Sequence, residues 1–147
     1  MTLKAQITED MKTAMRAKDS TRLGTIRLLQ AAVKQREVDE RIELNDDDVI
    51  SVIEKMLKQR RDSITAYESA NRTDLADVEK AEVLVLQTYL PQQLTEDEVV
   101  ELLEKVVADT GATDMKDMGK VMAAIKPLVA GKADMGRISG LIKSRLA

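Results

Sequence analysis

The stretch KQRRDSITAY, residues 58–67, decides how the first part of this chain folds. A repeat with spacings of four, three, four and three runs into and through this stretch, at Ile53, Leu57, Arg60, Ile64 and Tyr67. This repeat is typical of a helix that buries one face. Arg60 occupies one of the buried positions although its guanidinium stays charged. The pattern therefore predicts a long helix over about residues 46–70 that carries a cation on its inner face.

A second helix with a charged residue on its inner face is predicted between the turn ANRTD, residues 70–74, and Pro91. Its inner positions are Leu75, Val78, Glu82, Val85 and Tyr89. A hairpin folded at about residues 71–72 would place Arg60 opposite residue 83, one position from Glu82. Because an unpaired buried charge is costly, we expect Arg60 and Glu82 to form a structural ion pair that fixes the register of the hairpin. The alternative is that both side chains reach solvent at the edge of the seam.

Local signals predict the remaining N-terminal helices. A face formed by Leu3, Ile7 and Met11 predicts a first helix that ends near Asp19. Ser20 is the expected cap of a second helix, which fades into the charged stretch QREVDERIE, residues 35–43. Asn45, followed by three aspartates, is the expected cap of the long helix.

The last third of the chain predicts three shorter helices. TEDE at residues 95–98 has the capping-box pattern, and Gly111 is expected to close that helix. Pro127 should end or kink the next helix, and Asp134 should cap the last one. Since no segment alternates with period two, we predict an all-α protein. Residues 1–92 would form an N-terminal bundle of long antiparallel helices, and residues 93–147 a small C-terminal three-helix module.

The composition excludes several kinds of site. The chain has 147 residues, 44% of them apolar and 33% charged, with no cysteine and no histidine. Disulfides, thiol nucleophiles, the usual zinc spacings and the commonest general base are therefore absent. The three aspartates at 46–48 lack the glycine and the glutamate of a calcium loop, since Ser51 and Leu57 stand at those places. We expect no metal and no cofactor.

The N-terminal residues and the hydropathy predict a cytoplasmic protein. The first residues have no apolar core of a signal peptide, and their acidic side chains argue against a transit peptide. No run approaches the roughly 20 apolar residues of a membrane span. We expect no membrane contact, and a monomer.

Charge is distributed unevenly along the chain. Residues 115–147 contain seven Lys or Arg and two Asp, hence +5, whereas the whole chain carries −3 and the first 114 residues therefore −8. The candidate RNA-binding residues are these seven cations: Lys116, Lys120, Lys126, Lys132, Arg137, Lys143 and Arg145. Since the two tyrosines occupy inner helix positions, any RNA contact should read shape and phosphates and not stack on bases. The alternative is a solvated basic face with no ligand.

Several motifs, in this order, resemble the YqeY family over essentially the whole chain. They are KQRRDSI with Tyr67, the pattern A.R.DL from Ala70 to Leu75, Glu79 and Glu82, YLPQQL, TGA, DMGKVM and GKADMGRISGLIK. The family is similar to the tail of GatB, the B subunit of a glutamine-dependent tRNA amidotransferase. The resemblance implies two helical subdomains, a contact with tRNA, and the label carbon–nitrogen ligase with glutamine as amido-N-donor.

The residues offer little for amidotransferase chemistry. Without cysteine or histidine, a glutaminase nucleophile would have to be Ser, Thr or Tyr, and only a Ser–Lys arrangement through Ser63 or Ser139 stays open. The GK at 119–120 fails the P-loop pattern, because Asp114 replaces its first glycine and Val121 its Ser/Thr. We therefore expect an accessory protein without catalytic residues that contacts tRNA or a tRNA–enzyme complex through its C-terminal module. The alternative is a helical protein–protein interaction module with no RNA contact.

Overall fold

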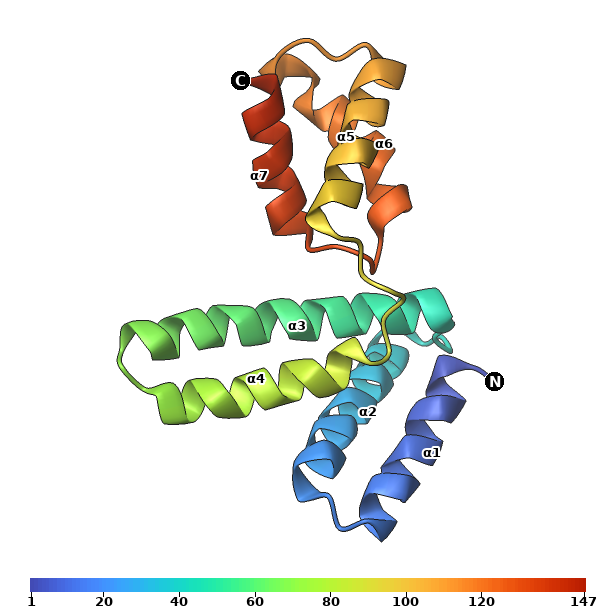
Figure 1. Cartoon of the computed structure of the whole chain (residues 1–147). Coiled ribbons are helices and arrows are strands. Elements are labelled where there is room, and N and C mark those ends of the chain that lie inside the picture. Colours follow the sequence, from blue (N-terminus) through green and yellow to red (C-terminus); the bar gives the residue numbers. More distant parts are fainter. The chain divides into compact units, whose positions relative to one another are not determined.

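The computed structural model describes residues 1–147 and contains helices and loops but no strand (Figure 1). The predicted all-α class is confirmed. The chain divides into two compact units, Met1–Leu90 and Pro91–Ala147, where the sequence predicted a division after residue 92. The helices of the first unit are α1 (Leu3–Arg16), α2 (Ser20–Glu40), α3 (Asp46–Ser69) and α4 (Thr73–Gln87). Those of the second are α5 (Glu96–Thr110), the short 3-10 helix η1 (Met115–Asp117), α6 (Met118–Val129) and α7 (Met135–Leu146).

The first unit is built on the antiparallel hairpin of α3 and α4, against which α1 and α2 pack (Figure 1). Its core is aliphatic, with Tyr89 as its one buried aromatic residue. The largest fully buried side chains are Ile26, Leu29, Ile53, Leu57 and Leu86. No residue between Lys58 and Glu82 belongs to this core cluster. The closed end of the hairpin is therefore held by contacts between α3 and α4 themselves.

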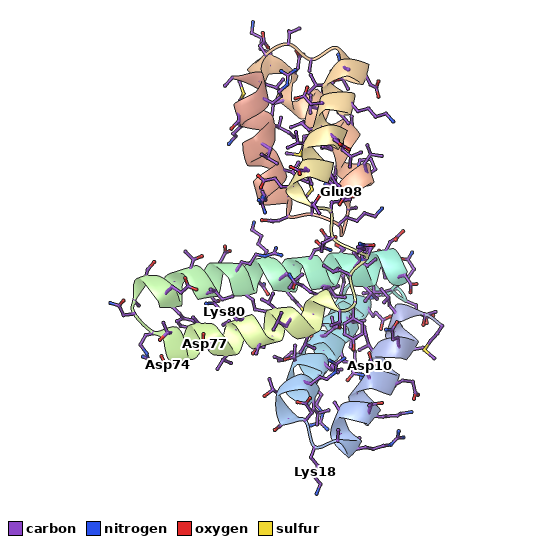
Figure 2. All side chains as sticks on the ribbon, in the orientation of Figure 1. Asp10, Lys18, Asp74, Asp77, Lys80 and Glu98 are labelled. Atoms are coloured by element: carbon purple, nitrogen blue, oxygen red, sulfur yellow. The ribbon has the colours of Figure 1, made fainter.

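The hairpin turn follows the prediction, but the inner face of α4 is rotated. Asn71 adopts the left-handed conformation with φ of 57°, and Lys80 on α4 pairs with Glu68 on α3 at 3.0 Å (Figure 2). Val78, predicted to point inward, is 56% exposed, whereas Ala76 is fully buried. Burying the small Ala76 lets the two helix backbones approach closely, and this turns Val78 to solvent.

The α2 helix differs from the prediction at both ends. It is capped by Asp19, whose carboxylate accepts a hydrogen bond from the Arg22 amide, and Ser20 is its first helical residue. At the other end α2 does not fade but continues through the charged stretch to Glu40. The charges there have partners, because Arg36 donates to the Asp48 carbonyl at 3.2 Å and Glu37 binds Lys4 at 2.6 Å.

The predicted caps are present at the starts of α3, α5 and α7. Asn45 and Asp48 form a reciprocal capping box at α3, and Thr95 and Glu98 form another at α5, where Figure 2 labels Glu98. Asp134 accepts from the Gly136 amide at the start of α7. These side chains satisfy backbone N–H groups that the first turn leaves free.

The second unit packs α5, α6 and α7 around an aliphatic core of its own. Gly111 closes α5 with φ of 69°, as predicted. Pro127, predicted to end or kink its helix, does not end it, because α6 continues to Val129, which is fully buried. Pro127 lies in the last turn of α6, where the packing of Val129 keeps the helix intact. No helix of either unit is long and apolar enough to span a bilayer.

Candidate functional site

Arg60 and Glu82 meet inside the α3–α4 hairpin. Arg60 Nε donates to Glu82 Oε2 at 2.8 Å, and the two side chains are 14% and 18% exposed. The Arg60 guanidinium also donates to the Met56 carbonyl at 3.4 Å. These two side chains, expected as a pair, lie together beyond the core of the first unit. A shift of register along the hairpin would leave both charges without a partner in a partly buried place.

Two of the seven candidate cations of the C-terminal unit form ion pairs with α5. Arg137 binds Glu96 at 2.8 Å and Arg145 binds Glu104 at 2.6 Å. Both pairs join residues 41 positions apart, so α7 runs parallel to α5. The hydrogen bond that Arg145 donates to the Glu104 carboxylate raises the pKa of the Arg145 guanidinium.

The five lysines of this set occupy different elements and faces. All are exposed: Lys116 on η1, Lys120 and Lys126 on α6, Lys132 in the loop that follows, and Lys143 on α7. Lys120 and Lys126 are six positions apart, which places them about 120° apart around the helix axis. Lys120 also lies near Asp117, whose pKa is lowered mainly by the Thr113 backbone amide and to a smaller extent by this lysine. The seven side chains thus do not form a single row.

The C-terminal unit as a whole is not basic. Residues 91–147 contain nine acidic and eight basic residues, hence a net charge of −1. Six of the acids lie on α5: Glu96, Asp97, Glu98, Glu101, Glu104 and Asp109. The net charge given above for residues 115–147 covers α6 and α7 but leaves out α5, although the three helices share one core. The structural unit therefore has an acidic helix beside two basic ones.

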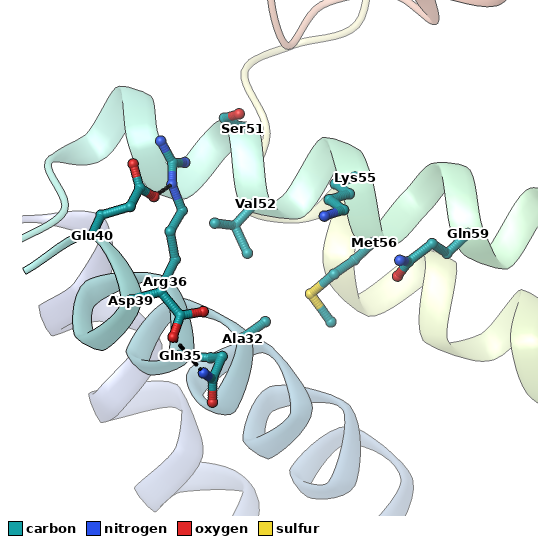
Figure 3. Close-up of a pocket in the computed structure, with 10 residues that line it drawn as sticks. All are labelled: Ala32, Gln35, Arg36, Asp39, Glu40, Ser51, Val52, Lys55, Met56 and Gln59. Atoms are coloured by element: carbon teal, nitrogen blue, oxygen red, sulfur yellow. Dashed lines mark hydrogen bonds and ion pairs between the residues drawn. The ribbon is translucent and has the colours of Figure 1, made fainter.

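A pocket of about 550 Å³ lies between α2 and α3 (Figure 3). Its apolar side chains are Ala32, Val52 and Met56. At its rim, Gln35 donates to Asp39 at 2.9 Å and Arg36 pairs with Glu40, as Figure 3 shows. Sequence reasoning identified none of these residues as a site.

The titratable groups of the first unit include one buried phenol. Tyr89, 4% exposed, donates from its hydroxyl to Asp10 Oδ2 at 2.7 Å. Burial, reinforced by this hydrogen bond, raises the pKa of Tyr89 far above its usual value. Nowhere in the chain do three or more acidic side chains converge in a way that could hold a metal ion.

Curated relatives of this chain include proteins with the name "Altered inheritance of mitochondria protein 41, mitochondrial". The relative from Vanderwaltozyma polyspora is 33% identical over 118 residues, which cover 75% of this chain and 63% of that protein. The relative from Meyerozyma guilliermondii is 32% identical over 140 residues, covering 83% and 73%. That from Pyrenophora tritici-repentis is 33% identical over 137 residues, covering 93% and 67%. The chain spans about half to two thirds of the length of several of these relatives.

These names contradict the cytoplasmic location predicted from the sequence. The matched relatives are mitochondrial proteins by name. The prediction relied on the acidic residues near the N-terminus and on the absence of an apolar signal core. Neither feature separates this chain from relatives that are named as mitochondrial.

A comparison with models of protein families extends the likeness to nearly every residue. The model named YqeY, described as "Yqey-like protein", matches residues 4–146. That range includes the Arg60–Glu82 hairpin and all three helices of the C-terminal unit. The chain belongs to the YqeY family.

Proposed function

We propose that this YqeY-family chain is an accessory protein that acts by binding and has no catalytic residues of its own. Its ligand is tRNA or a tRNA–enzyme complex, contacted through lysines of the C-terminal unit. The observation that supports this proposal is that Lys116, Lys126 and Lys143 are exposed and form no ion pair, whereas Arg137 and Arg145 are neutralised by α5. Unpaired lysines on short helices can approach phosphates.

The amidotransferase context comes from the resemblance to the tail of GatB. In that enzyme the resemblance implies a tail that contacts tRNA, while other domains carry out the amide transfer. The activity of a carbon–nitrogen ligase with glutamine as amido-N-donor therefore belongs to the large enzyme. The present chain would assist such an enzyme or its tRNA.

The charge distribution sets the expected strength of the tRNA contact. Each lysine that neutralises a phosphate releases a counterion, so affinity falls as salt is added. With few unpaired lysines and an acidic α5 in the same unit, binding should be weak and should disappear at high salt. It should also be insensitive to base sequence, because phosphate contacts carry no sequence information.

A titration of tRNA against the full chain tests this proposal. Lys126→Gln combined with Lys143→Gln should weaken binding and lower the slope of log K against log salt by about 0.7–0.9 for each lost phosphate contact. Lys105→Gln is the matched control, since it removes an exposed lysine from the acidic α5 of the same unit. Equal losses in the double variant and in the control would contradict a specific role for α6 and α7.

A second candidate is a protein–protein interaction module with no RNA contact. The pairs Arg137–Glu96 and Arg145–Glu104 favour it, because they remove two of seven cations from any phosphate ligand. The net charge of −1 on the unit favours it as well. Absence of any salt-dependent tRNA binding in the titration would decide for this candidate.

A further inference from the structure

The α2 helix has apolar residues on two opposite faces. Its inner face carries the buried Thr25, Ile26, Leu29 and Val33. On the other side lies an outer stripe, defined here as Gly24, Leu28, Ala31, Gln35 and Val38, all of them exposed. Leu28 is 49% exposed and Val38 63%. One face of α2 therefore serves the core, and the opposite one is left to solvent.

The spacing of the outer stripe is that of a helix–helix seam. Its members follow one another at intervals of four, three, four and three residues, the repeat by which two helices interlock side chains. The stripe spans residues 24–38, about 21 Å along the axis at 1.5 Å per residue. Single exposed apolar residues are ordinary. Five uncharged positions in register over four turns, in a chain with 33% charged residues, form a continuous seam.

The charges beside the stripe differ between its two flanks. One flank carries a basic row, defined here as Arg27 and Lys34, which lie seven residues apart, are exposed and form no ion pair. The other flank carries Ala32 and Asp39, and Asp39 accepts from Gln35 at 2.9 Å. That flank opens on the pocket between α2 and α3, with Ala32, Val52 and Met56 on its wall (Figure 3). Flanking charges of this kind select the partner of a helical seam.

We propose that the outer stripe of α2 is a docking surface for an amphipathic helix of another protein, whose seam is flanked by acidic residues that face the basic row. This inference concerns the N-terminal unit and is independent of tRNA binding by the C-terminal unit. The apolar seam provides the buried area, and the basic row sets partner and orientation. The pocket beside Ala32 accepts a side chain from the far edge of the docked helix.

The basic row argues against a second copy of this chain as the occupant. In an antiparallel pair of identical helices each flank faces its own counterpart, so Arg27 and Lys34 would face like charges. In a parallel pair the basic row would face the flank of Ala32 and Asp39, which offers a single acid. An acidic partner helix leaves no cation of the row unmatched.

The test uses the full chain and two synthetic helical peptides with the same apolar seam. One peptide carries Glu at its flanking positions and the other carries Lys. Fluorescence polarisation at about 50 and 200 mM salt should show binding of the acidic peptide, weakened by salt, and little binding of the basic one. Combined Leu28→Gln and Val38→Gln should weaken binding at least about tenfold. Leu84→Gln, which changes an apolar residue 67% exposed on α4, is the matched control and should leave binding unchanged.

Charge reversal makes the test specific. Arg27→Glu combined with Lys34→Glu should transfer the preference to the basic peptide, whereas Lys58→Glu on α3 should not. Circular dichroism checks that each variant remains helical. The proposal is overturned if neither peptide binds, if the preference does not follow the reversed row, or if sedimentation shows wild-type dimers that Leu28→Gln and Val38→Gln dissociate. The tRNA titration is unaffected by any of these outcomes, so the two proposals fail separately.

Discussion

Arg60 and Glu82 lie 22 positions apart in the sequence, and their side chains meet at 2.8 Å between α3 and α4. The pair lies where the hairpin has left the core of the first unit, and it joins α3 to α4 alone. Desolvation offsets much of the attraction within a buried ion pair. The contribution of this pair is therefore to the register of the hairpin more than to its net stability.

Removing one partner of this pair should cost more than removing both. Arg60→Met leaves Glu82 partly buried and unpaired, and we expect a loss of about 2 kcal/mol in the free energy of unfolding. The double variant with Glu82→Leu should recover most of that loss, because no charge is left behind. Urea unfolding of the four proteins of this cycle measures the coupling. Additive losses would show that the two side chains act independently.

The buried Tyr89 should make the protein sensitive to alkali. Its pKa is raised in the folded state, so the folded protein keeps the phenol proton when the unfolded chain releases it, above pH about 10. The unfolded state is then favoured as pH rises, and stability falls by up to about 1.4 kcal/mol per pH unit for this one proton. Tyr89→Phe should reduce that slope.

The same variant should lose stability at neutral pH. It removes the hydrogen bond to Asp10, which should cost about 1–2 kcal/mol. Unfolding free energies measured between pH 7 and 11 for both proteins test the two effects together. Parallel curves for the two proteins would show that the loss of stability at high pH is not caused by a phenol that titrates only in the unfolded state.

Glu37 should make the free energy of unfolding fall at low pH, which is the opposite pH dependence to that of Tyr89. The hydrogen bond from Lys4, followed by that from the Leu44 amide, lowers the pKa of this carboxyl below its ordinary 4.5. A carboxyl pKa that is lower in the folded state stabilises the fold at pH values above the pKa of the unfolded state. This contribution disappears as pH falls through the pKa of the folded state. Glu37→Gln should therefore lose less stability than the wild type on acidification. Asp62→Asn, at an exposed carboxylate without an ion pair, is the control for urea midpoints between pH 7 and 3.

Two glycines of the C-terminal unit should respond oppositely to alanine. Gly140 lies within α7, and a Cβ built there meets no atom within 4 Å. Gly140→Ala should raise the free energy of unfolding by about 0.5–1 kcal/mol, since glycine loses more backbone freedom on folding. Gly111 has φ of 69°, and Gly111→Ala should lower the free energy of unfolding by about 1 kcal/mol. Thermal unfolding of both variants checks the pair, and a destabilising Gly140→Ala would contradict the open space around that position.

The starts of α3, α5 and α7 could be predicted because their signals are local. Asn45, Thr95 and Asp134 each bond an amide two or three residues further on, so the pattern within one turn is sufficient. The errors have non-local causes. Val78 is exposed because the packing of Ala76 sets the rotation of α4. The α2 helix is longer than predicted because Lys4 of α1 and Asp48 of α3 stabilise its charged end.

By itself the sequence determined the helical class, the caps of α3, α5 and α7, the hairpin and the expectation that Arg60 needs Glu82. Periodicity and short-range hydrogen bonding suffice for these, since they depend on neighbours within a few residues. Only the tertiary structure decided which charges remain available to a ligand. Arg137 and Arg145 are neutralised by residues 41 positions away, and Arg27 and Lys34 are left unpaired beside an exposed seam. Electrostatic attraction depends on distance in space, which the order of residues along the chain does not give.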